Sequence, residues 1–342
     1  MMSIAARWLH HTFNEMTSQP DDRLWSRLLK RLLFPASLVY GFSVKFRNLL
    51  YDRSIFHSIG TEGLVVSVGN IEVGGTGKTP FVIALCHQLQ QFAKVGVVSR
   101  GYGSLTAKRQ DPIVIEGDKL SAMECGDEPL LIARHLPGAI VIVGKDRIKG
   151  VKLAQKKGAD LVVLDDGMQH RRLKRDIEIV LVTRRIHNGQ FLPAGVLRDD
   201  PKRLETADFV FRADGVDFCL QPTGIFSIKE GKPISIEGKR VALLCGIARP
   251  MRFYESVKAL GAHIEEVCFY PDHFEFSSSN LSKITKKFKK KGIEIVLCTE
   301  KDGVKLETYE THLPVAVLKI ELRSTNNNDA WSALINKIKE KL

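Results

Sequence analysis

The sequence lacks both a long apolar run and any pattern of paired cysteines. An uncharged stretch near the N-terminus, residues 32–44, contains Pro35 and is shorter than the roughly 20 apolar residues that a helix needs to span a bilayer. The six cysteines are scattered, mostly in apolar runs, and none forms a C-x-x-C pair. We therefore expect no membrane-spanning helix, no disulfides and no zinc site, but buried reduced thiols in a cytosolic protein.

Acidic residues are also scarce relative to basic ones. The 342 residues include 39 acidic and 51 basic side chains, which gives a formal net charge of +12. Such an excess points to anionic partners: a nucleotide, a nucleic acid, a phosphorylated substrate or an acidic membrane surface. The lysine-rich stretch at 283–291 has no interleaved aromatic residue except Phe288. We therefore expect it to be a solvated helix face, and we expect no nucleic-acid partner.

Residues 65–79 have the order of a phosphate-binding loop: a β-branched run, a glycine-rich turn and the start of an apolar helix. In such loops backbone N–H groups cradle an anion, a lysine neutralises phosphates and a hydroxyl holds Mg²⁺. The spacing is irregular, because Glu72 stands where the usual pattern has its first glycine, and Val73 where one family of ATPases has a signature lysine. A glycine-rich turn without a ligand is the alternative. We predict that a nucleoside triphosphate binds at Gly74, Gly75, Thr76, Gly77, Lys78 and Thr79.

Two carboxylates end an apolar run further along the chain. The run at 161–164 leads into Asp165 and Asp166, and Gln169 and His170 follow in the turn. A strand that ends in aspartate beside the P-loop strand is where a P-loop enzyme coordinates or orients Mg²⁺. The alternative is a strand-end turn in which Asp165 only caps a loop.

Three other loops carry side chains suited to the same cleft. Arg100 and Tyr102 follow a strand, where an arginine could clamp phosphate and a tyrosine could stack on a sugar or base; a plain glycine-rich turn is the competing interpretation. Asp127 precedes a helix, so it is either an N-cap or a proton acceptor for an attacking hydroxyl. His273 follows a strand in the second half of the chain. A lone histidine is usually structural, but this one could orient an aspartate base across a cleft.

The first fifty residues differ from the rest of the chain. Between residues 23 and 33 leucines and Trp25 recur at helical spacing, with arginine and lysine at the other positions. A basic amphipathic helix of this kind is suited to lying in a membrane interface. An ordinary helix packed on the domain, with a solvated basic face, remains the alternative. The first twenty residues show no pattern that we interpret.

Downstream, short apolar runs alternate with helical patterns, which predicts an α/β fold with a P-loop NTPase-like, mostly parallel sheet, helices on both faces and a smaller second α/β lobe. We predict strands at 64–68, 95–99, 113–115, 140–143, 161–165 and 177–182, then at 241–245, 264–269, 293–298 and 315–318. The expected parts are an N-terminal amphipathic segment (1–55), a P-loop kinase core (56–213), a turn-rich hinge or linker (214–238) and a second lobe that closes the cleft (239–342).

Taken together, these motifs resemble the tetraacyldisaccharide 4′-kinase (lipid A 4′-kinase) family over roughly residues 20–320. The matching elements, in this order, are S-V-G-N-x3-G-G-T-G-K-T-P (67–80), S-R-G-Y-G (99–103), G-D-E-P (126–129), L-D-D-G-x-Q-H (164–170), L-P-A-G-x-L-R (192–198), D-H-F (272–274) and T-E-K-D (299–302). The irregular P-loop spacing is a feature of that family.

The resemblance implies a kinase that transfers the γ-phosphoryl group of ATP to the 4′-hydroxyl of an acylated glucosamine disaccharide 1-phosphate in lipid A biosynthesis. It implies a peripheral or monotopic protein on the anionic inner leaflet, at the cytoplasmic face of the bacterial inner membrane. It assigns ATP to the P-loop with Gln169 and His170, and Mg²⁺ to Thr79, Asp165 and Asp166. Catalysis falls to Asp127 as base, His273 as its partner and Lys78. Substrate binding falls to Arg100, Tyr102, Arg147 and Arg198.

Two other functions keep the P-loop. One is a regulatory or partitioning ATPase without a lipid acceptor, against which the valine at position 73 and the histidine in the second lobe count. The other is a nucleic-acid-binding ATPase, suggested by the net charge alone and unsupported by any recognisable nucleic-acid-binding motif. The sequence predicts neither the oligomeric state nor the acyl-chain preference.

Overall fold

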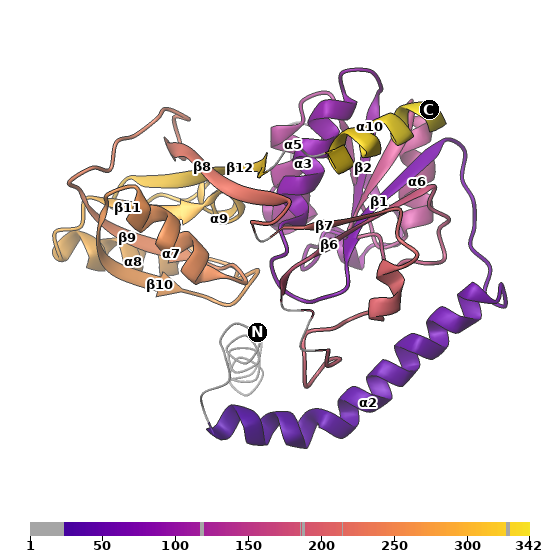
Figure 1. Ribbon diagram of the computed structural model, residues 1–342. Coiled ribbons are helices and arrows are strands. Elements are labelled where there is room, and N and C mark those ends of the chain that lie inside the picture. Colours follow the sequence, from indigo (N-terminus) through magenta and orange to yellow (C-terminus); the bar gives the residue numbers. More distant parts are fainter. Residues whose placement is uncertain (1–23, 117–119, 185, 187–188, 214, 326–328) are drawn as a thin grey trace.

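Two α/β lobes and one long helix make up the part of the chain that the computed structural model describes: residues 24–116, 120–184, 186, 189–213, 215–325 and 329–342. Each lobe is built on its own sheet, and the helix α2 (Leu24–Asp52) runs beside the first lobe (Figure 1). Residues 1–23, in the expected N-terminal segment, lie outside the described residues, as do the side chains of Leu24 and Trp25.

A seven-stranded sheet forms the first lobe, in the order β3-β4-β2-β5-β1-β6-β7. β3 runs antiparallel to β4, and the other neighbours are parallel. Every residue of β1, β2, β5 and β6 is buried, because parallel strands are covered on both faces. The strands are β1 (Leu64–Asn70), β2 (Val95–Ser99), β3 (Ile113–Val114), β4 (Ile140–Val143), β5 (Leu161–Asp165), β6 (Ile177–Val182) and β7 (Phe209–Arg212).

Helices cover both faces of this sheet. Apolar side chains of α3 (Lys78–Leu89), α5 (Asp127–His135) and α10 (Asp329–Lys341) fill the core on one face, and those of α6 (Arg147–Lys156) fill the core on the other. The short helices η1 (Thr106–Lys108), α4 (Ala122–Cys125) and η4 (Pro201–Leu204) lie in the connections. The predicted fold class is confirmed, and the strands predicted at 95–99, 140–143, 161–165 and 177–182 have these bounds in the structure.

The second lobe is a five-stranded sheet in the order β10-β9-β11-β12-β8, parallel except for the β12–β8 pair. Its strands are β8 (Phe218–Ser227), β9 (Arg240–Cys245), β10 (His263–Phe269), β11 (Ile295–Thr299) and β12 (Val315–Ser324). Its helices are α7 (Pro250–Ala259), α8 (Ser278–Lys290) and α9 (Glu300–Leu306). Separate apolar clusters lie on the two faces, one around Phe288 and one around Phe253.

Two segments lie elsewhere than the expected domain bounds placed them. Residues 218–227, expected in a linker, form β8, an edge strand whose Pro222 and Gly224 break the apolar alternation and lie at a bulge against β12. α10, expected in the second lobe, crosses back to the first. Its Trp331 packs edge-on against Phe81 of α3, with ring centroids 5.3 Å apart, and its Nε1 donates to Gln88.

The parallel register gathers the candidate site residues at one edge of the first sheet. Val68 near the end of β1 lies opposite Asp165 at the end of β5, and the Ser99 hydroxyl at the end of β2 donates to Asp165 Oδ2 over 2.9 Å. The P-loop and the turn after Asp165 both leave from this edge. It is the edge at which ligands bind in open α/β sheets.

α2 docks on the first lobe through one stripe of small and polar residues. Ser37, Gly41, Val44 and Asn48 are buried, at the spacing of one helix face. The Ser37 hydroxyl donates to the carbonyl of Phe191 over 2.6 Å. Across the described residues, no helix combines the length and apolar character that crossing a membrane demands.

Candidate active site

The P-loop is held by two buried polar side chains. Glu72, which replaces the usual first glycine, is fully buried and accepts hydrogen bonds from the backbone N–H (2.7 Å) and hydroxyl (2.9 Å) of Thr183 at the end of β6. Asn70 donates to the Glu72 carbonyl over 2.6 Å and to the Thr76 hydroxyl over 3.0 Å. Gly77 has a φ of 83° at the N-cap of α3, a conformation that favours glycine. The irregularly spaced P-loop is therefore held in place by the hydrogen bonds of Asn70 and Glu72.

Four side chains gather where the loop meets the end of β5, and we call Asn70, Lys78, Asp166 and Arg198 the phosphate cluster. Lys78 Nζ lies 3.1 Å from Asn70 Oδ1 and 3.5 Å from Asp166 Oδ1. Arg198 binds Asp166 with both terminal nitrogens, one of them over 2.9 Å, and also donates to Asn70. Two cations thus converge on one carboxylate, as expected of a site that binds polyanionic phosphates.

The pKa values of the two adjacent carboxyl groups, Asp165 and Asp166, are shifted in opposite directions. Burial raises the pKa of Asp165 to about 6, and the negative charges of Glu128 and Asp166 add to the rise. Burial acts the same way on Asp166, but Lys78 and Arg198 outweigh it and hold the pKa of Asp166 below its usual range. Asp166 also has a φ of 58°, a strained conformation for a residue other than glycine.

Oxygen atoms suited to Mg²⁺ are present at this edge. Thr79 is the second residue of α3, Asp165 ends β5, and Asp166 follows it in the turn. One hydroxyl and one or two carboxylates, completed by phosphate oxygens and water, are the ligands that Mg²⁺ prefers. The donor set therefore fits the predicted metal. Among the described residues, no group of three or more His, Cys, Asp or Glu side chains forms a metal cluster without such help.

Of the other predicted residues of this edge, Gln169 and His170 are half-buried and Arg147 is buried. Gln169 donates to the Asn70 carbonyl (2.9 Å) and to Asp199 (3.3 Å). Burial, together with the charge of Arg147, lowers the pKa of His170 to about 4, so His170 is neutral at pH 7. Arg147 is 3% exposed and donates to the backbone carbonyls of Gly144 and Asp165. This places the Arg147 guanidinium under the strand ends rather than at the open face.

A second group of charges joins the two lobes, and we call Asp127, Glu128, Asp272, His273 and Lys301 the lobe-spanning cluster. His273 Nδ1 lies 3.1 Å from Asp127 Oδ1. Lys301 Nζ donates to Glu128 (2.9 Å) and Asp272 (3.0 Å) and lies 3.2 Å from His273 Nε2. The predicted pairing of Asp127 with His273 is therefore present as a contact between residues of the two lobes.

Charge pairing dominates the titration of this cluster. Burial would raise the pKa of Asp127, but its hydrogen bond with His273 and the nearby charges of Lys301 and Lys305 hold it below the usual range. Burial would lower the pKa of His273, but the contact with Asp127 raises it overall. Asp127 is thus an ionised carboxylate at neutral pH, with a partner that compensates its charge.

The loop after β2 contacts the lobe-spanning cluster. Tyr102 is 65% exposed, and its ring faces that of His273 with centroids 5.3 Å apart. Gly101 packs against the turn before Asp127, where a Cβ would come within 2.6 Å of the Cys125 carbonyl, so a side chain does not fit. Arg100 is exposed beside Tyr102. The S-R-G-Y-G and G-D-E-P motifs are therefore in direct contact.

Comparison with known proteins agrees with this geometry. A family model described as tetraacyldisaccharide-1-P 4′-kinase matches residues 29–339. The chain is 38% identical to the tetraacyldisaccharide 4′-kinase of Syntrophus aciditrophicus, covering 85% of this chain and 88% of that relative. It is 35% identical to the enzyme of the same name from Vibrio campbellii, covering 94% and 95%.

The same architecture occurs in a solved structure. An LpxK from Aquifex aeolicus, crystallised in complex with ATP, matches with a TM-score of 0.76 and 31% identity over 91% of this chain and 99% of that one. The chain belongs to the tetraacyldisaccharide 4′-kinase family. The family resemblance carried by the motifs is thereby confirmed.

The structure of this family member also shows contacts of residues to which the motifs assigned no role. Asn70 holds the P-loop and Lys78, and Lys301 links three residues of the lobe-spanning cluster. Lys305 lies 2.8 Å from the buried Asp302 and 3.7 Å from Asp127. The signals were available, because Asn70 belongs to the S-V-G-N motif and Lys301 to the T-E-K-D motif.

Proposed function

We propose that this protein transfers the γ-phosphoryl group of ATP to the 4′-hydroxyl of a tetraacyldisaccharide 1-phosphate. Membership of the kinase family supports the activity, and the ATP complex of the Aquifex aeolicus relative supports the donor. The observation that carries the proposal is the contact between Asp127 and His273, 3.1 Å across the two lobes. A carboxylate paired in this way at the P-loop edge of the sheet suits activation of an acceptor hydroxyl, which a purely regulatory ATPase does not need.

In this mechanism the phosphate cluster binds ATP. The N–H groups of residues 74–77 and the start of α3 face the β- and γ-phosphates, and Lys78 and Arg198 neutralise the charge that develops on the transferring group. Asp127 accepts the proton of the 4′-hydroxyl as the new oxygen–phosphorus bond forms. The bond between the γ-phosphorus and the bridging oxygen breaks, and ADP leaves. His273 holds Asp127 in position and compensates its charge.

Thr79, Asp165 and Asp166 would hold Mg²⁺, with Ser99 orienting Asp165. When bound, the ion supplies positive charge to the phosphate oxygens. Arg147 supports Asp165 from below through its backbone carbonyl. Arg100 and Tyr102 would contact the acceptor, because both are exposed and the Tyr102 ring lies against that of His273. The second lobe would close on the acceptor through the lobe-spanning cluster.

α2 would bring the enzyme to its lipid substrate at the cytoplasmic face of the inner membrane. The side of the helix away from the docked stripe carries large exposed apolar side chains: Leu28, Leu32, Phe34, Leu38, Val39, Phe42, Phe46 and Leu49. The same helix has five basic residues and one acidic residue. Apolar area for the acyl boundary and cations for anionic headgroups suit a peripheral or monotopic protein.

Charged substitutions on α2 test the membrane role without removing the docked stripe. We expect Leu32→Glu, Leu38→Glu and Phe42→Glu together to abolish flotation with vesicles of anionic phospholipid and to raise KM for acyl substrate more than KM for ATP. The matched control is Met251→Glu, Leu260→Glu and Val267→Glu, three exposed apolar residues of the second lobe. Flotation of the α2 variant equal to that of the control would contradict the membrane role.

The activity itself is tested with ATP labelled in the γ-phosphate and a tetraacyldisaccharide 1-phosphate in mixed micelles. The expected product is a labelled bis-phosphorylated lipid that requires both substrates and Mg²⁺. Release of labelled phosphate without any lipid product would instead favour a regulatory ATPase.

A further inference from the structure

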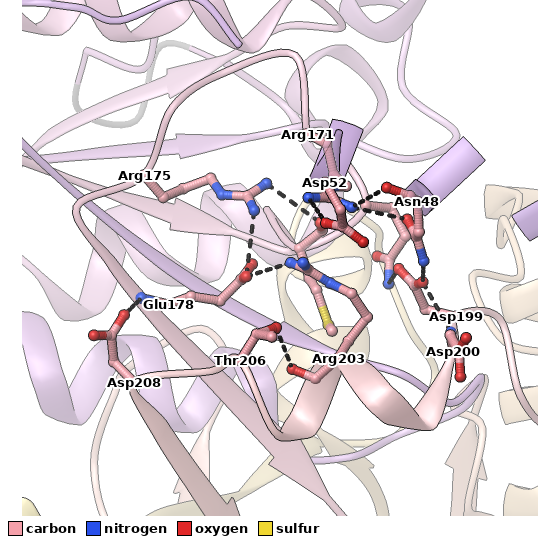
Figure 2. Close-up of polar contacts among 12 residues, drawn as sticks. Asn48, Asp52, Arg171, Arg175, Glu178, Asp199, Asp200, Arg203, Thr206 and Asp208 are labelled. Atoms are coloured by element: carbon pink, nitrogen blue, oxygen red, sulfur yellow. Dashed lines mark hydrogen bonds and ion pairs between the residues drawn. The ribbon is translucent and has the colours of Figure 1, made fainter. Parts of the chain in front are cut away.

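α2 docks on Arg198, which belongs to the phosphate cluster, and on Asp199, the residue that follows it. The Tyr40 hydroxyl donates to the backbone carbonyl of Arg198 over 3.2 Å. Asn48 Nδ2 donates to Asp199 Oδ1 over 2.7 Å, and Arg47 Nη2 lies 3.8 Å from Asp199 Oδ2. Figure 2 shows Asn48 above Asp199, joined to it by this hydrogen bond. The helix therefore contacts the chain at Arg198 and at the residue directly after it.

Arg198 and Asp199 also contact residues on the phosphate side of the site. Arg198 binds Asp166 and Asn70 through its side chain, and its N–H donates to the carbonyl of Ile71 at the start of the P-loop over 2.8 Å. Asp199 is fully buried, and its Oδ2 accepts from the Gln169 amide over 3.3 Å. One buried carboxylate thus lies between the helix and the turn that follows Asp165.

A second connection runs from α2 to that turn. Arg171, two residues after Gln169, donates to the Asn48 carbonyl over 3.0 Å and to Asp52 Oδ1 over 2.6 Å (Figure 2). Its guanidinium also lies over the ring of Tyr51, 5.1 Å from the centroid. Asn48 therefore contacts two of the four chain segments that bring side chains to the phosphate cluster: the loop at 198 and the turn after β5.

The far end of the 198–204 segment has an anchor of its own. Arg203 binds the buried Glu178, which Arg175 also contacts over 3.2 Å, and the Glu178 N–H donates to Asp208 (Figure 2). Because this network does not involve α2, loss of the Asn48 contact leaves the segment attached. The effect of such a loss should be confined to Arg198, Asp199 and Gln169.

We propose that Asn48 is a positioning residue through which the seating of α2 sets the placement of Arg198 and Gln169 at the phosphates. The inference rests on the proposed function of Arg198 and on the ATP-binding role that the family resemblance predicts for Gln169. α2 carries the exposed apolar side chains on its outer side and the Asn48 contact on its inner side. A displacement of the helix at the membrane would therefore reach the nucleotide side through the buried Asn48–Asp199 hydrogen bond, which acts beside the contacts of Tyr40 and Arg171.

The test combines a like-charge substitution with its reversal. Asn48→Asp places a second carboxylate against Asp199, and we expect kcat to fall about 30-fold and affinity for a fluorescent ATP analogue about tenfold, since small misplacements at a reacting centre can cost up to 10²-fold. The reversed pair, Asn48→Asp with Asp199→Asn, should recover at least about fivefold in kcat because the hydrogen bond can form with donor and acceptor exchanged. Flotation with anionic vesicles should be unchanged in both variants.

Ser37→Ala is the matched control, because it removes a buried hydrogen bond of the same helix that does not involve Asp199. We expect it to change kcat less than about twofold, and Asn48→Ala to lower kcat by about fivefold to tenfold. If Asn48→Asp does not fold, Asn48→Ala decides. Parent-level kcat and nucleotide affinity in a folded Asn48 variant, or no recovery in the reversed pair, would overturn the proposal. Because nucleotide affinity is measured without a lipid acceptor, it tests the Asn48 proposal even if the proposed lipid kinase activity fails.

Discussion

The two charged clusters of the site differ in where their residues come from. The phosphate cluster is built within the first lobe, from the end of β1, the start of α3, the end of β5 and the loop at 198. The lobe-spanning cluster takes Asp127 and Glu128 from the first lobe and Asp272, His273 and Lys301 from the second. In the proposed mechanism, nucleotide binding is therefore arranged in one lobe, whereas activation of the acceptor depends on how the two lobes meet.

The strands that lead into the two clusters also differ in how deeply they are buried. β1 and β5, which lead into the phosphate cluster, are buried at every position. β10, which leads into the loop of His273, alternates between exposed and half-buried residues over most of its length. Contacts between α5 and α9, including one of 2.9 Å between His135 and Glu300, help to hold the lobes together. Less densely packed elements have more freedom to move, so the lobe-spanning cluster is the more adjustable of the two.

The largest effect is expected from the first cluster. Lys78→Ala should lower phosphoryl transfer by at least about 10³-fold, because it removes the charge that stabilises the transferring group. Its melting temperature should stay close to that of the parent, since Lys78 is partly exposed. The control is Lys229→Ala, which breaks an exposed ion pair with Glu310 in the second lobe. Near-normal turnover in folded Lys78→Ala protein would remove the P-loop assignment.

A smaller effect is expected from the lysine of the lobe-spanning cluster. Lys301→Met removes the cation that Glu128 of the first lobe shares with Asp272 of the second. Residues of the two lobes should then be positioned less accurately relative to each other, and kcat should fall about tenfold. KM for ATP should hardly change, because the phosphate cluster remains whole. Lys291→Met, which removes an ion pair with Glu266 in the same lobe, is the control. A rise in KM for ATP as large as the fall in kcat would show that the two clusters are not separable.

The smallest effect concerns stability and pH. The folded pKa of His273 is raised above its ordinary value of 6.5, so its charge stabilises the fold below pH 6.5 and that contribution disappears as pH rises through the folded pKa. The pKa of Asp127 is lowered, so its contribution is lost only in strong acid. The free energy of unfolding of the parent should exceed that of His273→Gln by about 1–2 kcal/mol at mildly acidic pH.

Denaturant melts of both proteins at about pH 6 and about pH 9 measure this difference. The gap between them should shrink at the higher pH. If the difference in unfolding free energy between the two proteins is the same or larger at about pH 9 than at about pH 6, the fold does not stabilise a charge on His273.

Much of this arrangement could be predicted from the sequence, and the exceptions have physical reasons. Asp165, Asp166 and Lys78 stand in motifs whose spacing along a strand, loop or helix fixes where they lie. Lys301 is 173 residues from Glu128, and their contact depends on how the second lobe folds back. A local pattern carries no such information.

Two further exceptions concern where the Arg147 side chain points and which surface α10 packs against. Arg147 follows a strand, as a residue lining the cleft would, but its guanidinium is buried under the strand ends, and sequence spacing does not separate these orientations. The apolar face of α10 is visible in the sequence, but its partner is not. The aromatic cluster around Phe81 that receives Trp331 is assembled from distant segments of the chain.

The central claim is that Asp127 and His273 act as one unit across the lobes, and a double-mutant cycle tests it most directly. Asp127→Asn keeps an oxygen for the Glu128 N–H, which Asp127 Oδ1 accepts over 3.0 Å, but it cannot take up a proton at neutral pH.

We predict that kcat falls by about 10²–10⁴-fold in Asp127→Asn and similarly in His273→Ala, with little change in KM for ATP. The double variant should be no more than about threefold worse than the poorer single variant, since residues that act as a unit are not additive. Near-parent kcat in Asp127→Asn would exclude Asp127 as the base. Full multiplicative loss in the double variant would show that the two residues act independently and would contradict the account.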